Sequence, residues 1–512
     1  MSLTLASSTP VSPGDPAKRV PGGRLSKVVR RIFSFPVALS GLLSVLAVLT
    51  ARARFNDPDL WWHLKTGQFI WTTHTIPQVD LFSFTALHHA LIPHEWLFQA
   101  AMYGVYRAGG FSGLMFLFCC MSAAILIAGY ALCSMYAQNS KVAFLGALTI
   151  FVFATTGFSI RPQLLGYLLL IFELILIHLG RSRNPRWFFA LPPLFALWIN
   201  CHGSFFMGLI VGGALLLSSL FRFESGLLIA EPWNPRSRRT LLLSLALSAA
   251  ALLLNPAGVK QVLYPLDTLL HQPINLGSIE EWQPLQLNSQ RGICFLAILA
   301  AIFLLVALRK AVLYFDELIL LVLGVWLAGS HVRLLFVFGI LSAPILARML
   351  ATSWENYEAS SDRPFANAVL LALALLTMVW VFPSAQNLAG QVEEQSPVKA
   401  LAFIRAQHLS GPMLNEYQYG GYLIWAAPEH PVFIDGRADL YEWAGVLEQF
   451  SNWATLHDDP NLLLDKYGVQ FCLLSAQSPM AHVLPLLHSW KSVYSDQNSI
   501  VFQRISPAVA PK

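Results

Sequence analysis

Residues 24–53 read RLSKVVRRIFSFPVALSGLLSVLAVLTARA, a basic flank followed by an apolar run. The apolar part, residues 33–53, is longer than the ~7–15 residues of a cleaved signal core. It is long enough to cross the ~30 Å hydrocarbon layer of a membrane. Basic flanks of spanning helices stay in the cytoplasm. The stretch therefore predicts a first spanning helix behind a cytoplasmic tail, residues 1–32, with basic residues Lys18, Arg19, Arg24, Lys27, Arg30 and Arg31.

Apolar stretches of this kind recur along most of the 512 residues. Hydrophobic residues make up 55% of the chain and charged residues 12%, against roughly 25% charged in soluble domains. The pattern predicts a polytopic α-helical membrane protein with about eleven transmembrane helices in residues 33–384. We place these helices at 35–52, 111–134, 142–158, 164–180, 187–200, 204–221, 240–254, 292–309, 315–330, 333–350 and 366–383, with an amphipathic lead-in at 97–108.

The distribution of basic residues predicts which loops face the cytoplasm. If the N-terminus is cytoplasmic, alternate loops must also be, and these loops hold the basic clusters. The clusters are Lys141; Arg181, Arg183 and Arg186; Arg222, Arg236, Arg238 and Arg239; Arg309 and Lys310; and Arg348. The protein is thus expected in the inner (plasma) membrane, with loops 54–96 and 255–291 and everything after residue 384 exoplasmic or periplasmic. No basic face for nucleic acid is available outside the N-terminus.

The composition changes in the tail, residues 385–512, which has mixed polarity. A helix-like stretch spans residues 396–408, and strand-like runs cover 413–414, 422–425, 431–435 and 469–475. Gly-Pro, Gly-Gly and Asp-Gly pairs separate these runs, as turn residues do. The tail predicts a small C-terminal α/β domain on the exoplasmic side.

The first exoplasmic loop carries the densest set of chemically active residues. Glycosyl transfer needs a carboxylate as base and positive charge for a departing phosphate, and paired carboxylates also suit a divalent cation, Mg²⁺ or Mn²⁺. Aromatic rings there stack on a sugar or hold a lipid headgroup. The alternative is that one aspartate caps the next helix, the other is solvated, and the tryptophans form an interfacial belt. The candidates are Asp57, Asp59, Trp61, Trp62, His63 and Glu95.

Further polar residues from separate segments end on the same membrane face. Guanidinium groups bind phosphate or pyrophosphate well, although an arginine at an interface also snorkels and a lone histidine is more often a satisfied hydrogen-bonding residue. Their shared sidedness predicts one pocket at the outer leaflet. These residues are Arg161, Asn200, His202, Glu280, His331 and Arg333.

The tail adds a second polar set, Glu416, Tyr419, Asp435 and Arg437. Aromatic residues interleaved with carboxylates are typical of a carbohydrate-facing or headgroup-facing surface, but a strand–turn core with an internal Asp–Arg pair explains them equally well. The cluster His88, His89 and His94 matches no strong metal-ligand spacing.

The Asp57-Pro58-Asp59 loop, together with the topology of residues 33–383, resembles the GT-C superfamily of integral membrane glycosyltransferases. The resemblance implies an acidic motif beside the catalytic centre and a polyprenyl-phosphate or polyprenyl-diphosphate sugar as donor. Residues 415–422, NEYQYGGY, are similar to an oligosaccharyltransferase motif but lack its paired Trp. The combination DPDLWWHL, HEW, NCHG, NEYQYGGY and FIDGRADLY resembles an uncharacterised family of bacterial membrane proteins.

These features predict an inverting sugar transfer on the exoplasmic face, to a glycan, lipid or protein acceptor. Asp57 or Asp59 is the expected base or acceptor-orienting carboxylate, and Glu95 is the second acidic candidate. Arg161 and Arg333 are expected to hold the lipid phosphate, assisted by His63, His202 and His331. Two alternatives are a polymerase or ligase of lipid-linked glycans and a transporter or flippase of lipid-linked sugars. The pattern predicts no particular oligomeric state.

Overall fold

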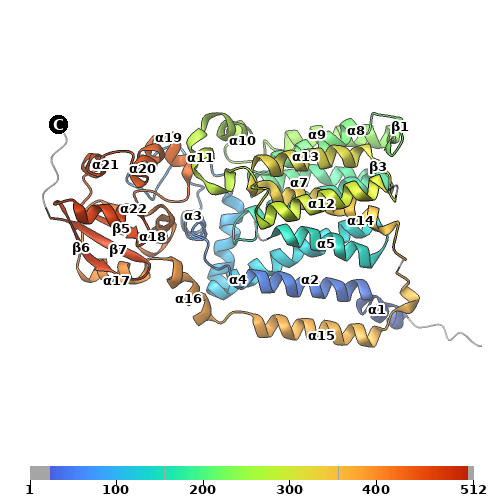
Figure 1. The fold of residues 1–512 in the computed structure, drawn as a ribbon, viewed down its shortest axis with the longest axis horizontal. Helices are drawn as coiled ribbons and strands as arrows, with labels where there is room; N and C mark the ends of the chain where they lie inside the picture. Colours follow the sequence, from blue (N-terminus) through green and yellow to red (C-terminus); the bar gives the residue numbers. More distant parts are fainter. Residues whose placement is uncertain (1–23, 155–156, 309, 356, 506–512) are drawn as a thin grey trace, which may run out of the picture.

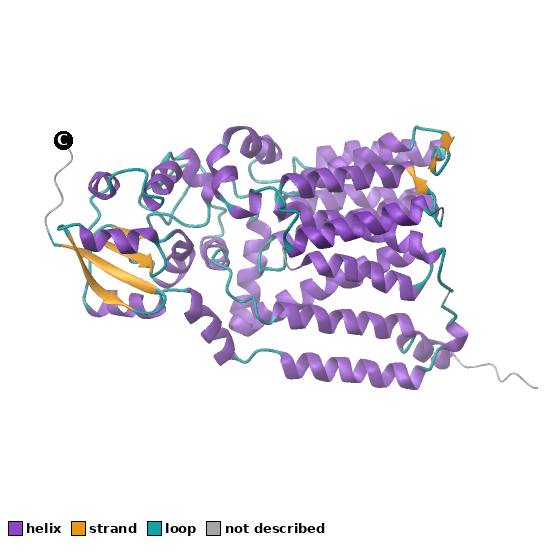
Figure 2. Ribbon diagram, viewed as in Figure 1, coloured by secondary structure: helices purple, strands orange, loops and turns teal. Residues whose placement is uncertain are grey.

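The structure is a computed structural model that describes residues 24–154, 157–308, 310–355 and 357–505. A bundle of roughly parallel helices forms one end of the molecule, and a smaller unit with a β-sheet lies at the other (Figures 1 and 2). Where the two parts meet, segments from the N-terminal half of the chain contact segments from the C-terminal half. Lys18, Arg19 and Arg309, which support the predicted topology, lie outside the described residues.

Every apolar stretch of the sequence contains a helix of the bundle. Among the described residues, five helical segments are long and apolar enough to cross a membrane: α4, α6, α12, the segment Val332–Ala351 and α15; α2, α5 and α8 are shorter apolar helices. The nine residues of α7 rise only ~14 Å, so the predicted count of eleven spans remains a prediction. The bundle consists of α1 (Arg24–Ile32), α2 (Phe35–Ala51), α4 (Trp96–Ala137), α5 (Ser140–Ala154), α6 (Gln163–Ser182), α7 (Leu191–Ile199), α8 (Phe205–Ser218), α9 (Pro235–Ala251), α12 (Gln290–Ala307), α13 (Phe315–Ser330), α14 (Leu335–Ala351) and α15 (Pro364–Val381).

The core of the bundle surrounds α14. Nearly all of its side chains are buried, and it packs on α4, α5 and α13. A helix that is apolar on all sides must be surrounded by other helices or lipid. By contrast, α12 and α15 leave large apolar side chains uncovered, including Phe303 and Trp380. This pattern is that of an integral membrane protein, in which the outer helices face hydrocarbon.

The two ends of the bundle differ in chemistry. The end that holds α1 also holds a small sheet of β1 (Phe223–Ser225), β2 (Leu228–Ala230) and β3 (Leu313–Tyr314) (Figure 1). Ion pairs Arg181–Asp316 and Arg348–Glu317 close this end, and the predicted cytoplasmic loops lie here. The segments predicted to be exoplasmic lie at the opposite end, beside the C-terminal unit.

Short helices cover this second end. They are α3 (Leu60–Thr73), α10 (Val259–His271), α11 (Pro273–Ser278), and the 3-10 turns η2 (Glu280–Trp282) and η3 (Val332–Leu334). Gly110 breaks α4 with a φ of 59°, a left-handed conformation that glycine adopts without steric cost. The first part of α4 is therefore a separate lead-in, as the sequence predicts for residues 97–108.

The C-terminal unit contains a four-stranded sheet of order β4-β5-β7-β6. Strand β4 is parallel to β5, with Leu414 opposite Cys472, and the other two pairs are antiparallel. Strands β4 and β5 bury almost every residue because helices cover the sheet. The unit comprises α16 (Ala385–Gln395), α17 (Val398–Ala406), β4 (Met413–Asn415), η5 (Tyr417–Tyr419), α18 (Gly420–Ala426), α19 (Ala438–Trp443), α20 (Val446–Ala454), α21 (Pro460–Lys466), β5 (Phe471–Ser475), α22 (Pro479–Val483), η6 (Leu484–Leu486), β6 (Trp490–Ser495) and β7 (Ser499–Arg504).

Two of the predicted strands in the tail are wrong. Residues 422–425 lie in α18, which packs against α3. Residues 431–435 form no strand in the described part of the chain; an isolated bridge between Ser83 and Val432 joins them to the loop 54–96. The hairpin of β6 and β7 was not predicted. Tertiary contact with the loop, rather than local propensity, decides the conformation of residues 422–435.

Candidate active site

The acidic loop between α2 and α3 is held in a fixed turn. Asp57 is 5% exposed, and its Oδ1 accepts the backbone N–H of Asp59 at 2.9 Å. Asp59 precedes α3, and its Oδ1 accepts the indole N–H of Trp62 at 3.1 Å. Gly436 of the C-terminal unit lies so close that a Cβ there would collide with the Asp59 carboxylate. The Oδ2 atoms of both aspartates face Arg161.

Arg161, in the turn between α5 and α6, bridges the two aspartates. Its Nε lies 2.6 Å from Asp57 Oδ2, and its Nη1 lies 3.0 Å from Asp59 Oδ2. Burial alone lowers the pKa of Arg161, but the two carboxylates outweigh burial and raise it well above its ordinary value. Burial raises the pKa of Asp59 to about 6, although Arg161 opposes the shift. Asp59 is thus a carboxyl group that titrates close to neutral pH.

A second arginine lies beside the first, linked by a glutamate. Arg333, in η3, donates from Nη2 to Gln163 Oε1 at 2.8 Å and lies over the ring of Trp282. Glu281, in η2, lies 3.8 Å from Arg161 Nη1 and 3.4 Å from Arg333 Nη1. Both distances are longer than a charge-assisted hydrogen bond, and the Glu281 side chain is 43% exposed. It is the most loosely held charged group of the cluster.

Glu95, just before α4, is surrounded by three histidines. Its carboxylate oxygens lie 3.6 Å from His63 Nδ1, 3.8 Å from His94 Nε2 and 3.7 Å from His202 Nε2. Burial raises the pKa of Glu95. Burial also lowers the pKa values of His63 and His202 well below their ordinary values. Loss of solvent favours the uncharged form of each group.

The structure thus joins most of the predicted residues into one cluster at the end of the bundle next to the C-terminal unit. Asp57, Asp59, Arg161, His202 and Arg333 come from four separate segments and are not dispersed. Electrostatic coupling links the two halves, because Arg333 acts on both Glu95 and His202. His331 lies at the edge, where its Nδ1 is 2.6 Å from the Trp282 carbonyl oxygen.

Two other predicted residues, Asn200 and Trp61, make their contacts within the fold. Asn200 accepts from Trp96 Nε1 at 2.7 Å and donates to the Ala196 and Leu254 carbonyls, so its amide is fully used. Trp61 is buried between Phe111 and Tyr422 and offers no face to a sugar.

Glu280 is exposed and makes no ion pair with any described residue. Its neighbour Glu281 takes the position that the sequence interpretation gave to Glu280. Adjacent residues of a tight turn point in different directions, so only one of the two glutamates reaches the arginines.

The C-terminal candidates form two groups. One lies against the loop 54–96, and the other lies inside the tail. Arg437 pairs with Asp435 and Asp80 in a buried network. Glu416 Oε2 accepts the backbone N–H of Ser475 at 3.2 Å, and the Tyr419 hydroxyl donates to the Asn498 carbonyl at 2.8 Å. These bonds favour the core interpretation of the tail residues over a carbohydrate-facing surface.

Residues that the sequence did not single out complete the site. Gln163 holds Arg333, Gln99 donates to His63 Nδ1 at 3.1 Å, and Ser204 contacts His202 Nδ1 at 2.8 Å. Among the described residues no group of three or more His, Cys, Asp or Glu side chains has metal-binding geometry.

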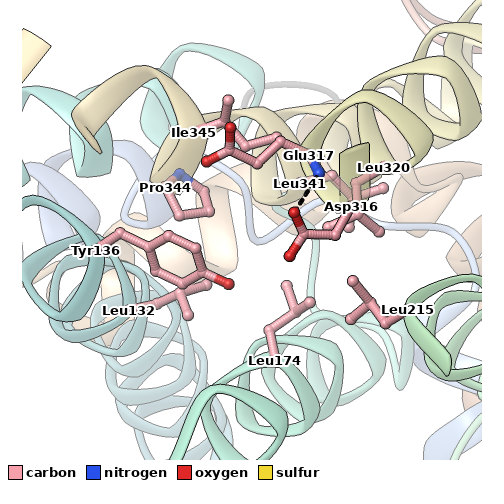
Figure 3. Close-up of a pocket in the computed structure, with 10 residues that line it drawn as sticks. All are labelled: Leu132, Tyr136, Leu174, Leu215, Asp316, Glu317, Leu320, Leu341, Pro344 and Ile345. Atoms are coloured by element: carbon pink, nitrogen blue, oxygen red, sulfur yellow. Dashed lines mark hydrogen bonds between the residues drawn. The ribbon is translucent and has the colours of Figure 1, made fainter. Parts of the chain in front are cut away.

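The hollow shown in Figure 3 is separate from this cluster. It is lined by Asp316 and Glu317 in the first turn of α13, whereas Arg333 follows the last turn of that helix. Sixteen residues of helix rise ~24 Å. Apolar side chains of α4, α6, α8 and α14 complete the lining, so the hollow belongs to the end of the bundle that holds β1–β3.

The overall fold is shared with solved structures of an oligosaccharyltransferase and of ArnT. No protein-family profile and no curated protein sequence matches the chain. The oligosaccharyltransferase of Archaeoglobus fulgidus, tethered to an acceptor peptide with an NVT sequon, superimposes with a TM-score of 0.56 at 14% identity, over 93% of this chain and 75% of that chain.

Two further structures share the fold. ArnT of Cupriavidus metallidurans bound to undecaprenyl phosphate gives a TM-score of 0.51 at 14% identity, over 93% of this chain and 99% of that chain. The archaeal enzyme with an inhibitory peptide and a dolichol-phosphate gives 0.52 at 12% identity, over 85% and 69%. At sequence identities this low, the structural similarity establishes a common fold and nothing more. The activity must be argued from the site.

Proposed function

We propose that the protein transfers a sugar from a polyprenyl-phosphate-linked donor to a glycan, lipid or protein acceptor on the exoplasmic face. The proposal rests on one observation: Asp57, Asp59 and Arg161 lie next to Glu281 and Arg333 at one end of the membrane bundle.

In this proposal the tail 1–32 is cytoplasmic, residues 33–384 form the membrane domain, and residues 385–512 form an exoplasmic domain. The neighbours with undecaprenyl phosphate and dolichol-phosphate support a lipid-phosphate donor.

Asp59 is the proposed base. Its pKa of about 6 keeps it deprotonated near neutral pH and still able to accept a proton. The acceptor hydroxyl passes its proton to Asp59 as its oxygen attacks the anomeric carbon of the sugar. The bond from that carbon to the lipid-phosphate oxygen breaks, and the phosphate leaves with the electron pair.

The arginines divide the remaining work. Arg161 is held by two aspartates, so it orients Asp57 and Asp59 and lowers their mutual repulsion. Among the described residues, Arg333 forms an ion pair with Glu281 alone, at 3.4 Å, and its guanidinium fork suits a phosphate. A donor phosphate at Arg333 displaces Glu281. Trp62, His63, His202 and His331 border the space where the sugar and the acceptor bind.

A resident Mg²⁺ or Mn²⁺ on Asp57 and Asp59 fits this arrangement poorly. Two carboxylates are suitable oxygen ligands, but the Arg161 guanidinium already contacts one oxygen of each. A cation bound there must either displace the guanidinium or bind the Oδ1 atoms, close to the positive charge of Arg161. The steps above therefore involve only the side chains of the chain.

The test is the cell-envelope chemistry of a deletion strain. Mass spectrometry is expected to show a lipid-linked sugar that accumulates and a glycan product that loses one sugar. The wild-type gene restores the product, and a gene encoding Asp57→Asn with Asp59→Asn does not, although the variant protein reaches the membrane in normal amount. Full restoration by that variant would remove the aspartates from the mechanism.

The same strain distinguishes the alternatives. A lipid-linked glycan polymerase or ligase predicts that Arg161 and Arg333 variants fail while the aspartates are dispensable. A flippase predicts that purified protein moves the lipid-linked sugar across proteoliposomes without forming product. The charges lie at one end of the bundle rather than midway along it, where transport sites usually lie, and this position favours the transferase.

A further inference from the structure

Helix α10, in the loop 255–291, carries a row of large apolar side chains on its outer side. Four of them recur at intervals of three or four residues, so they lie on one face of the helix. These residues, which we call the apolar row, are Val259, Leu263, Leu266 and Leu270, and each is more than half exposed. A contiguous apolar row on a protein surface marks a contact with lipid or with another protein.

The opposite face of α10 is held by the protein. The buried side chain of Gln261 donates from Nε2 to the Ile199 carbonyl oxygen at 2.6 Å. The Tyr264 hydroxyl donates to Asp439 Oδ2 at 3.0 Å, and the Tyr264 ring stacks on the ring of His94 with 4.5 Å between the centroids. Successive helical residues point about 100° apart, which places Gln261 and Tyr264 across the helix axis from the apolar row. These contacts therefore fix the apolar row on the outer side of the helix.

The charged residues of α10 lie between these two faces. By the same spacing, Lys260, Asp267 and His271 share one flank of the helix, and His271 Nδ1 lies 2.7 Å from Asp267 Oδ1. An apolar face with a charged flank is typical of a helix that lies in the plane of a membrane interface.

The apolar row continues the lipid-facing surface of the bundle. Leu253 and Leu254 follow the end of α9, and both are more than half exposed. The chain then turns at Gly258, which has a φ of 58°, a conformation that glycine adopts without steric cost, and α10 begins at the next residue. In Figure 1, α10 lies along the same edge of the molecule as α8 and α9. This continuity favours lipid over a second protein as the partner of the apolar row.

We propose that α10 is a membrane-interface helix, with the apolar row inserted between the lipid headgroups and the acyl chains at the end of the bundle next to the C-terminal unit. Interfacial helices bury their apolar face by about 5–10 Å at this boundary. Through the hydrogen bond between Tyr264 and Asp439, the docked helix ties α19, and with it the C-terminal unit, to the membrane surface. The proposal concerns lipid contact and holds whether or not the protein transfers a sugar.

The docked helix also sets the depth of the candidate active site in the membrane. Tyr264 stacks on His94, whose Nε2 lies 3.8 Å from Glu95 Oε1. The histidine side of the site is therefore held at the level of the lipid headgroups. This consequence, unlike the lipid contact itself, rests on the proposed function, in which a lipid phosphate binds at Arg333.

Fluorescence quenching by lipid measures the contact in the full chain. A bimane fluorophore is attached to Leu266→Cys, in the apolar row, and to Lys260→Cys, on the charged flank, as the matched control. Both variants are placed in nanodiscs of phosphatidylcholine with brominated acyl chains, and the labelled wild-type chain supplies the background of the six native cysteines. Bimane at position 266 should lose at least half of its emission in brominated lipid and resist aqueous iodide. Bimane at position 260 should be quenched mainly by iodide.

Leu270→Cys lies in the same row and should repeat the result if Leu266→Cys does not fold. Equal quenching by iodide at positions 260 and 266 would show that the row faces water, and it would overturn the proposal. Protection of position 266 from both quenchers would show that protein covers the row, and it would overturn the proposal as well. Neither readout requires turnover, so the result stands apart from any test of sugar transfer.

Discussion

Two carboxylate–guanidinium clusters include aspartates of the loop 54–96, and they differ in how fully their charges are paired. At one, Arg437 contacts Asp80 at 2.7 Å and Asp435 at 2.6 Å, and the Tyr441 hydroxyl donates to Asp435 at 2.5 Å. All four side chains are buried. At the other, Arg161 is 20% exposed, and Glu281 is half-exposed and only loosely paired.

This difference separates a structural role from a chemical one. Every charged atom of the Arg437 cluster has a partner in the chain, so a ligand has nothing to bind there. The cluster joins the C-terminal unit to the loop through segments far apart in sequence. In the Arg161 cluster the neighbouring Arg333 is paired only loosely, with Glu281 at 3.4 Å, so its positive charge is the one proposed to meet the donor phosphate. The first should respond to substitution in stability and the second in activity.

The largest effect is expected at the closed cluster. Arg437→Met leaves Asp80 and Asp435 buried without a counter-charge, and it should destabilise the C-terminal unit by about 3–5 kcal/mol. Thermal unfolding of the purified protein measures the change. Arg405→Gln, which removes the exposed pair with Glu429, is the matched control and should cost no more than about 1 kcal/mol. Equal stability of the two variants would contradict the structural role.

The next effect is expected at the open cluster. Arg333→Gln removes the charge proposed to stabilise the departing phosphate, and it should lower kcat/KM for transfer by about 100-fold or more. The unfolding temperature should remain near that of wild type, because the contacts of Arg333 with described residues are weak: a neutral hydrogen bond to Gln163, a long ion pair and the ring of Trp282. Transfer at the wild-type rate would show that Arg333 does not contact the phosphate.

The pH dependence of transfer follows from Asp59. The base is active when deprotonated, and its pKa is about 6. The rate should therefore be constant above that pH and fall about tenfold for each unit below it. A kcat/KM profile between mildly acidic and mildly basic pH provides the measurement. A rate that rises on acidification would exclude Asp59 as the base.

The smallest effect sharpens the same assignment. The Trp62 indole N–H donates to Asp59 and lowers the pKa of that carboxyl, within a total shift that burial dominates. Trp62→Phe keeps the ring but removes the donor, so the acidic limb of the pH profile should move upward by less than about one unit. Trp61→Phe, in the buried neighbour, should leave the limb in place. An unmoved limb in Trp62→Phe would separate Trp62 from the base.

Hydropathy and charge sidedness predicted most of this architecture from the sequence. Each apolar stretch contains a helix, and Arg161 and Arg333 were predicted as site residues because they border apolar stretches on the same predicted face as the acidic loop. Asp57 and Asp59 followed from their spacing at a helix end. These signals are local, and the fold preserves them.

The errors lie where only tertiary contacts decide. Successive residues of a helix point about 100° apart, so the sequence does not tell which of Trp61 and Trp62 faces the core. The choice between Glu280 and Glu281 has the same cause. Gln99, Gln163 and Ser204 are neutral residues without periodicity, and their roles appear only once the histidine or arginine they contact is placed. Asn200 was predicted to line the substrate pocket, but its amide is used in hydrogen bonds within the fold.

A matched pair of aspartates on one loop tests the central claim most directly. Asp59→Asn should abolish glycan product in the complemented deletion strain while the purified protein unfolds at the wild-type temperature. Asp80→Asn should lower the unfolding temperature and leave transfer per folded molecule near normal. Full transfer by Asp59→Asn, or equal loss of transfer per folded molecule in both variants, would contradict the assignment of the Arg161 cluster as the active site.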